Sequence, residues 1–267
     1  MLMLAAIGAV CAIILVLAAV YMNVPGDENA ATIRDNLPGA NCGACGYAGC
    51  DGYADALAKG TETKVNLCVP GGESAARVIA ETLGLEYASV IEKVAFVKCM
   101  GDCNKSKRKF DYAGIESCKA ARMLYEGEWA CGPGCLGHGD CAAVCPNKAI
   151  AIVDGIARVD SMLCSGCGMC VKACPNGLIS LFSDENKVIV ACSNTEKGAV
   201  ARQKCDNACI GCKKCEKTCP SEAIKVINNL ATIDYDKCTK CMECAKACPV
   251  GCIMIGDFFG IHKYAEK

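Results

Sequence analysis

The sequence contains almost no histidine: only His138 and His262 occur in a chain of 267 residues. This scarcity excludes a zinc or haem protein that depends on imidazole ligands. Aromatic residues make up 5% and the formal net charge is −1, so no general basic surface for nucleic acid is expected. The sequence also contains no P-loop, nucleophile elbow or HExxH motif. The chain is therefore expected neither to bind nucleic acid nor to carry out substrate chemistry of its own.

Cysteine, by contrast, is abundant, with 27 residues in the chain. Dense thiols mark a disulfide scaffold in short secreted chains, but this chain is too long for that class. Short and regular cysteine spacings indicate metal sites instead. Because modules too small for a large core commonly need metal to fold, we predict several small metal-bound modules.

An apolar segment opens the chain, since no charged residue occurs from Met1 to Val24. This run reaches the roughly 20 residues that a helix needs to cross a bilayer, so residues 1–24 are predicted to form one transmembrane helix. A cleaved signal peptide is the alternative, but the run is too long and no basic residue precedes it. Residues 25–36 are expected to be a polar linker. Because metal-loaded cysteines belong in a reducing compartment, the remaining chain is expected on the cytoplasmic side of the cell membrane.

The first cysteine group shares one C-x2-C-x4-C-x17-C pattern. Its members are Cys42, Cys45, Cys50 and Cys68. Four thiolates are the ligands that a [4Fe–4S] cube requires. A zinc site is the alternative, but zinc ribbons usually pair two C-x2-C knuckles, whereas three of these cysteines share one loop. Residues 37–95 are predicted to form a small helical domain around this cube, with helices over 51–59 and 73–95.

Two later segments, 135–175 and 209–249, are copies of one pattern. The second copy contains C-x2-C-x2-C-x3-C-P twice, the run found in bacterial two-cluster ferredoxins. In such a run three close cysteines hold one cube, and the fourth, beside the proline, holds the other. A predicted hairpin separates the halves of each copy. The cysteines of the second copy are Cys209, Cys212, Cys215, Cys219, Cys238, Cys241, Cys244 and Cys248.

The first copy departs from this run at one position, where His138 replaces the counterpart of Cys212. Its remaining cysteines are Cys135, Cys141, Cys145, Cys164, Cys167, Cys170 and Cys174. Three explanations are open: His138 binds iron, a displaced cysteine substitutes, or the site holds a three-iron cluster. We expect Cys131 to substitute, because it lies shortly before Cys135 and a loop could return its sulfur to the vacant corner.

A further group of cysteines lies outside the standard ferredoxin motifs: Cys99, Cys103, Cys118, Cys131, Cys192 and Cys205. They could complete the irregular cube and build at least one more. With Cys11 and Cys252 set aside as small buried hydrophobic residues, enough thiols remain for five or six [4Fe–4S] clusters. The alternative is that Cys103 and Cys192 are ordinary buried cysteines.

Together these patterns predict an α+β protein. It comprises the transmembrane helix, the small helical four-cysteine [4Fe–4S] domain, and two tandem two-cluster ferredoxin-like modules over 96–185 and 186–267. A chain of cubes without substrate chemistry moves electrons one at a time. The sequence therefore predicts a membrane-tethered electron-transfer protein.

The chain resembles the B subunit of the Rnf electron-transport complex, its iron–sulfur component. The resemblance rests on the uncharged N-terminal helix, the Leu-Pro-Gly-Ala-Asn-Cys-Gly-Ala-Cys-Gly segment from Leu37, and the ferredoxin-like modules behind it. It implies a subunit of an oxidoreductase that passes electrons from reduced ferredoxin to NAD+ while exporting sodium or protons. This subunit would accept electrons from ferredoxin, while other Rnf subunits would bind flavin and NAD.

The four-cysteine domain also resembles one in corrinoid iron–sulfur proteins. A subunit of a different complex, such as a corrinoid or CO-dehydrogenase-type partner, is therefore the alternative function. One charged segment bears on the choice of partner, because four cations occur in five residues from Lys105 to Lys109. We expect this basic run to dock an acidic ferredoxin, and a solvated loop is the plain alternative.

Overall fold

The structure, a computed structural model, describes residues 8, 11–17, 27–183 and 188–255. Residues 11–17 are helical and exposed, and they belong to the segment predicted to cross a membrane. Most of that segment lies outside the described residues, so the transmembrane helix over 1–24 stays a prediction. Within the described ranges, no helix is both long enough and apolar enough to span a bilayer.

Three helices form the four-cysteine domain: α2 (Glu28–Asn36), α3 (Cys50–Ala58) and α4 (Gly72–Leu83). The Asp27 side chain caps α2 by accepting a hydrogen bond of 2.9 Å from the amide of Asn29. Ile33 of α2 is fully buried with Tyr53, Leu57 and Ile79. The linker expected over 25–36 is therefore wrong for α2, whose single apolar stripe belongs to the domain core.

The helix expected over 73–95 is also shorter than predicted. It ends at Leu83 because Gly84 takes a left-handed conformation with φ of +63°, which glycine tolerates and which closes the helix. The chain then enters strand β1 (Lys93–Val97). This strand pairs with the first ferredoxin-like module, so that module begins inside the range expected for the four-cysteine domain.

The first ferredoxin-like module alternates short helices with hairpins. After β1 it contains α5 (Cys118–Met123), α6 (Asp140–Ala143), β2 (Ile150–Val153), β3 (Ile156–Val159), α7 (Met169–Ala173) and β4 (Ile179–Ser183). Strands β1 and β4 pair antiparallel, with Val97 opposite Ile179. Strands β2 and β3 form the predicted hairpin, and Asp154 and Gly155 take positive φ at its turn.

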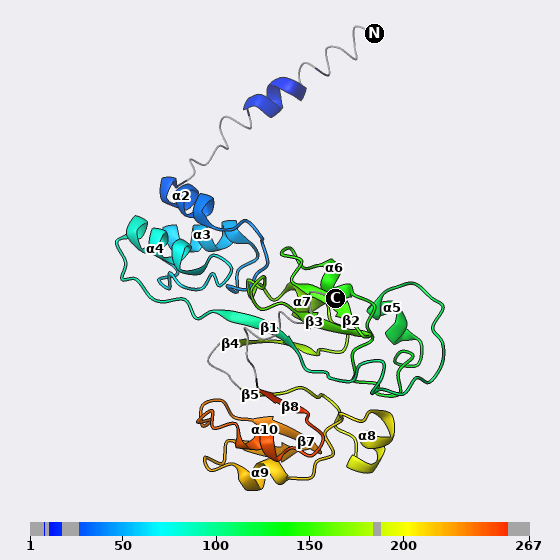
Figure 1. The fold of residues 1–267 in the computed structure, drawn as a ribbon. Helices are drawn as coiled ribbons and strands as arrows, with labels where there is room; N and C mark the ends of the chain where they lie inside the picture. Colours follow the sequence, from blue (N-terminus) through cyan, green and yellow to red (C-terminus); the bar gives the residue numbers. More distant parts are fainter. Residues whose placement is uncertain (1–7, 9–10, 18–26, 184–187, 256–267) are drawn as a thin grey trace.

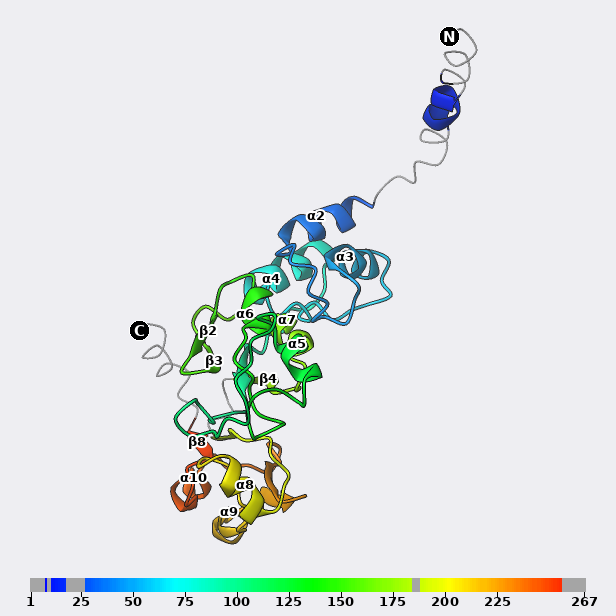
Figure 2. The ribbon, with the colours of Figure 1, turned by 90° about the vertical axis from the view of Figure 1, so that its right-hand side faces the viewer.

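The second module repeats this plan. Its elements are β5 (Val188–Val190), α8 (Gly198–Lys204), α9 (Lys214–Thr218), β6 (Ile224–Ile227), β7 (Leu230–Ile233), α10 (Glu243–Ala247) and β8 (Ile253–Ile255). Strand β5 pairs with β8, and β6 with β7 through a turn at Asn228 and Asn229. Figures 1 and 2 show the helical domain, the first module and the second module following one another along the molecule.

The two modules pack through an apolar seam between β1–β4 and β5–β8. Phe96 and Ile189 are buried there, and the Phe96 ring meets Phe182 edge-on with centroids 6.0 Å apart. Tyr235 extends the seam, because its ring lies 5.8 Å from Phe182 and its hydroxyl donates to the carbonyl of Val188. This seam fixes the cysteines of one module against those of the other.

One backbone feature recurs in all four half-motifs: the residue before the second ligand position takes a left-handed conformation. These residues are Gly137 (φ +78°), Gly166 (+66°), Gly211 (+63°) and Lys240 (+60°). At Gly137 both the backbone conformation and the lack of space favour glycine, because a Cβ would lie 2.3 Å from the carbonyl oxygen of Gly155. The loop that carries the cysteines therefore lies directly against the turn of the β2–β3 hairpin.

Candidate iron–sulfur centres

The first group of thiols, set I, lies between the loops of the helical domain and comprises Cys42, Cys45, Cys50 and Cys68. Burial, together with the other three thiols, raises the pKa of Cys68 to about 11. The Asn41 side chain fixes the loop by accepting a 2.8 Å hydrogen bond from the amide of Cys50. Lys172 of α7 donates to the carbonyl of Cys42 at 2.9 Å, which ties set I to the first module.

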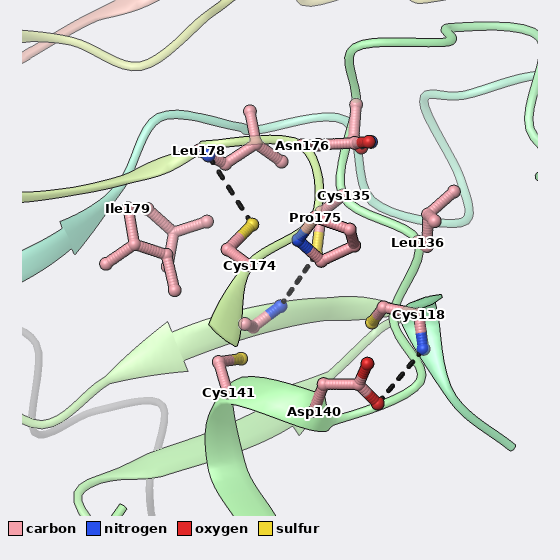
Figure 3. Close-up of a pocket in the computed structure, with 13 residues that line it drawn as sticks. Cys118, Cys135, Leu136, Asp140, Cys141, Cys174, Pro175, Asn176, Leu178 and Ile179 are labelled. Atoms are coloured by element: carbon pink, nitrogen blue, oxygen red, sulfur yellow. Dashed lines mark hydrogen bonds between the residues drawn. The ribbon is translucent and has the colours of Figure 1, made fainter. Parts of the chain in front are cut away.

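Set II lines a cavity of about 350 Å³ in the first module and comprises Cys118, Cys135, Cys141 and Cys174 (Figure 3). Apolar side chains such as Leu178 and Ile179 close its walls. Burial and the neighbouring thiols raise the pKa of Cys141 to about 12. Four thiols facing one cavity with apolar walls are a donor set for a metal cluster, because the cluster's positive charge would allow the thiolates to form.

Asp140 brings Cys118 into this set. Its carboxylate accepts hydrogen bonds of 3.1 Å from the amide of Cys118 and 3.0 Å from the amide of Lys119, at the start of α5. The Ser117 hydroxyl donates to the same carboxylate at 3.1 Å. Because a carboxylate stabilises the amides at a helix N-terminus, Asp140 fixes α5 beside its own neighbour, Cys141.

The expectation that Cys131 completes the irregular cube is therefore wrong, since Cys118 takes the fourth position. Cys131 lies in a different cavity, described below. His138 turns away from set II: its Nε2 lies 3.1 Å from the buried carboxylate of Glu128, and its ring packs on Tyr112. Histidine ligation is thus not supported by the geometry. The sequence had placed Cys118 among the cysteines that could complete the cube, but spacing favoured Cys131, which lies nearer to Cys135.

Set III comprises Cys145, Cys164, Cys167 and Cys170. Burial and the three neighbouring thiols raise the pKa of Cys170 to about 11. Cys145 comes from the first half of the motif, just as Cys174 of set II comes from the second half. This is the crosswise arrangement that the ferredoxin run predicts. Amides of Ala149 and Ala95 donate to the sulfurs of Cys145 and Cys164 at 3.3 and 3.4 Å, and such bonds adjust cluster potentials.

The second module repeats the arrangement in two cavities of about 300 and 310 Å³. Set IV comprises Cys209, Cys212, Cys215 and Cys248, and set V comprises Cys219, Cys238, Cys241 and Cys244. Cys252, set aside in the sequence, lines the set IV cavity as a fifth thiol, with its sulfur 3.6 Å from that of Cys248. The pattern gave no signal for it, because the first copy has Leu178 at this position.

The remaining thiols form the bridging set: Cys99, Cys131, Cys192 and Cys205. They line a cavity of about 310 Å³ at the seam between the modules. Cys103 joins no set and is exposed. Thus Cys192 lies with other thiols, whereas the structure leaves Cys103 outside every group. In the described part of the chain, no three or more metal-binding side chains converge on a single-ion site, and the thiols surround cavities instead.

Comparisons with known families identify iron–sulfur cluster domains over most of the described chain. Residues 37–70 match the FeS family of iron–sulfur cluster domains. Residues 163–224 and 208–252 match 4Fe-4S dicluster domains, and residues 131–185 match the LdpA Fe-S cluster-binding domain. The matches cover the helical domain and both modules, so the predicted ferredoxin-like domains are confirmed.

The chain is also similar to curated proteins over most of its length, each of them the B subunit of its complex. It is 43% identical to that of the Na(+)-translocating ferredoxin:NAD(+) oxidoreductase complex of Acetobacterium woodii, over 92% of this chain and 74% of that one. It is 44% identical to the proton-translocating counterpart of Clostridium ljungdahlii, over 77% and 73%. It is 40% identical to that of the ion-translocating oxidoreductase complex of Methanosarcina acetivorans, over 88% and 89%.

Fold and thiol sets together define an electron-transfer protein of the ferredoxin type that carries several [4Fe–4S] clusters. The long alignments at 40–44% identity also identify the family to which the chain belongs. The chain belongs to the family of B subunits of Rnf-type ion-translocating oxidoreductases, as the sequence resemblance implied.

Proposed function

We propose that this protein is a membrane-anchored electron-transfer subunit that accepts electrons from reduced ferredoxin. It passes them through its [4Fe–4S] clusters to other subunits of an Rnf complex, which reduce NAD+ and export Na+ or H+. The proposal is supported by the names of its relatives and by one observation above all: the thiol sets follow one another through the molecule.

Sets I to V are proposed to hold one [4Fe–4S] cluster each. Neighbouring sets lie close: Lys172 of α7 ties set I to the helix that carries Cys170 of set III. Cys170 in turn lies near enough to Cys141 of set II to raise the pKa of that thiol. When bound, the clusters supply reversible one-electron chemistry. The protein's own residues exclude water, donate hydrogen bonds to sulfur and keep the sets at fixed separations.

Residues 1–24 are proposed to anchor the protein in the cell membrane, with the cluster domains on the cytoplasmic side. The other Rnf subunits are proposed to bind flavin and NAD. The G-x-G-x-x-G match of this chain, at residues 132–137, lies between cysteines and contains a proline, and a dinucleotide fingerprint needs a preceding strand and a following helix. The direct test is reduction of the purified chain by reduced ferredoxin, followed as bleaching of the visible iron–sulfur absorbance. Clusters that dithionite reduces but ferredoxin does not would contradict the proposal.

The basic run gains support as a ferredoxin dock from its position. Ser106 forms an isolated β-bridge with Cys205 of the bridging set, and the amide of Lys107 donates to the carbonyl of Lys204. Lys105 and Lys107 are both exposed. A docked acidic partner would therefore lie close to a buried thiol set.

The structure also shows which cations to change. Arg108 lies over the Trp129 ring at 4.9 Å and pairs with Asp111, and Lys109 donates to the carbonyl of Tyr125. Because these contacts hold the loop, their replacement would disturb its structure. Lys105 and Lys107 are the better targets, since reversing them tests charge with less effect on the loop.

Replacing Lys105 and Lys107 by Glu is expected to slow reduction by ferredoxin about tenfold at low ionic strength, because complementary charge raises the association rate. The difference should shrink near 1 M salt, where the Debye length is about 3 Å. Stopped-flow reduction at several salt concentrations measures both. The matched control reverses Lys59 and Lys64, two exposed cations of the helical domain. Equal slowing by the control would show that net charge, and not this loop, governs the rate.

Truncation separates the anchor from the cluster-binding fold. A chain that begins at Asp27 keeps the cap of α2 and is expected to be soluble with its full iron content. A chain that begins at Gly39 loses Ile33 and Leu37 from the core, each contributing about 2 kcal/mol by burial. It is expected to lose the set I cluster. Iron and acid-labile sulfide per chain decide the matter, and full iron in the shorter chain would show that α2 is dispensable.

A further inference from the structure

We propose that the bridging set holds a sixth [4Fe–4S] cluster, which passes electrons between the two ferredoxin-like modules. The inference rests on the proposed function, because it adds one cluster to the same electron-transfer pathway. It assigns ligands to cysteines that lie outside every ferredoxin motif. It also explains why the chain has more thiols than five clusters need.

The bridging set draws two ligands from each module. Cys99 follows β1 and Cys131 lies between α5 and α6, both in the first module. Cys192 follows β5 and Cys205 ends α8, both in the second. All four line one cavity, as the four thiols of sets II, IV and V each do. A complete donor set therefore forms only where the two modules meet.

Three of the four thiols of this cavity are buried. Cys99, Cys131 and Cys205 are each at most 8% exposed. Burial, with the charges of the neighbouring thiols, raises the pKa of Cys131 to about 12. Four thiols lining one cavity form a donor set for a metal cluster, which would supply positive charge to the thiolates. The same donor chemistry applies at set II, where Cys118 and Cys141 are also buried.

A buried asparagine supports one ligand. Asn194 is 1% exposed, and its amide nitrogen lies 3.5 Å from the sulfur of Cys131 and 3.2 Å from the carboxylate of Glu196. Its carbonyl oxygen accepts a 2.7 Å hydrogen bond from the amide of Glu196. The side chain is thus held with its donor toward the sulfur. Asn194 is a positioning residue, because a donor to a ligand sulfur shifts the potential of the cluster.

Backbone hydrogen bonds connect the bridging set to a set on either side. The amide of Cys135, a member of set II, donates to the sulfur of Cys99 at 3.4 Å. The amide of Cys209, a member of set IV, donates to the sulfur of Cys192 at 3.4 Å. A cluster here would therefore share a direct hydrogen bond between ligand residues with a cluster in each module. Each transfer oxidises one cluster and reduces the next by one electron, and no bond or proton is involved.

The test replaces Cys131 and Cys205 together by Ala in the full chain, with exposed Cys103→Ala as the control. We expect the double variant to lose one cluster's iron and acid-labile sulfide and one EPR signal after dithionite reduction. The control should lose neither. Unchanged iron in the double variant would overturn the site, as would zinc in its place in the unaltered protein. Because dithionite reduces clusters without a partner, this result is independent of whether ferredoxin is the donor.

The linking role has its own readout. With ferredoxin as donor, the clusters of one module of the double variant should be reduced as fast as before. The fast phase in the reduction of the other module's clusters should disappear. Unaltered kinetics with one cluster missing would overturn the linking role. If the double variant loses all its iron, Asn194→Asp decides instead. A charge beside the sulfur of Cys131 should lower the potential of one EPR species, and an unshifted set of potentials would overturn the proposal.

Discussion

Replacing Cys118 by Ala is expected to abolish one [4Fe–4S] signal, whereas replacing His138 is expected to leave every cluster in place. Cys118 lines the set II cavity, while His138 points toward Glu128. A cube that loses one of its four thiolates is lost or converted to another form. EPR of the dithionite-reduced chain, with iron per chain, measures the difference.

Two further variants make this comparison specific. Cys141→Ala should abolish the same signal as Cys118→Ala, because both thiols line one cavity. His138→Gln removes the imidazole and keeps an N–H donor near the buried carboxylate of Glu128. The set II signal could instead disappear when His138 is replaced and persist in Cys118→Ala. That result would show that His138, and not Cys118, is the ligand.

Replacing Gly137 by Ala is expected to destabilise the first module by about 4 kcal/mol, the sum of backbone strain and overpacking. The added Cβ would lie 2.3 Å from the carbonyl oxygen of Gly155, and that oxygen belongs to a hairpin turn that cannot move alone. The positive φ of +78° adds strain for any residue with a side chain. The temperature at which the iron–sulfur absorbance bleaches should therefore fall clearly.

Gly139→Ala is the matched control for this prediction. Its φ of +81° is almost the same, but its Cβ would meet only the side chain of Ile152 at 3.7 Å, an ordinary contact. Backbone strain alone predicts a loss of about 1 kcal/mol. Equal shifts in bleaching temperature for the two variants would show that conformation, and not the contact with Gly155, makes Gly137 necessary.

The sequence predicted the features that are formed by residues close together along the chain. The ferredoxin run has fixed distances between its cysteines, and the hairpins between its halves carry their own turn residues, such as Asp154 and Gly155. Set I also follows directly from its cysteine spacing. In each case the residues that must meet lie close in sequence, so local patterns contain the information.

The sequence could not predict contacts made by tertiary packing. Cys118 reaches set II only because the Asp140 carboxylate, far along the chain, caps α5. Helix α2 is polar apart from a few positions, and its place in the domain becomes evident only when Ile33 is seen buried. Cys103 and Cys192 look equivalent in the sequence, yet one is exposed and the other lines a cavity.

The composition of the bridging set imposes a timetable on biosynthesis. Sets I, II and III are complete once Cys174 has left the ribosome, so the first 174 of the 267 residues could receive their clusters while the rest is still being made. The bridging set cannot, because Cys205 is synthesised later and its partners meet only after both halves have docked. Until then Cys99 and Cys131 would remain free thiols, which can oxidise before a cluster binds them.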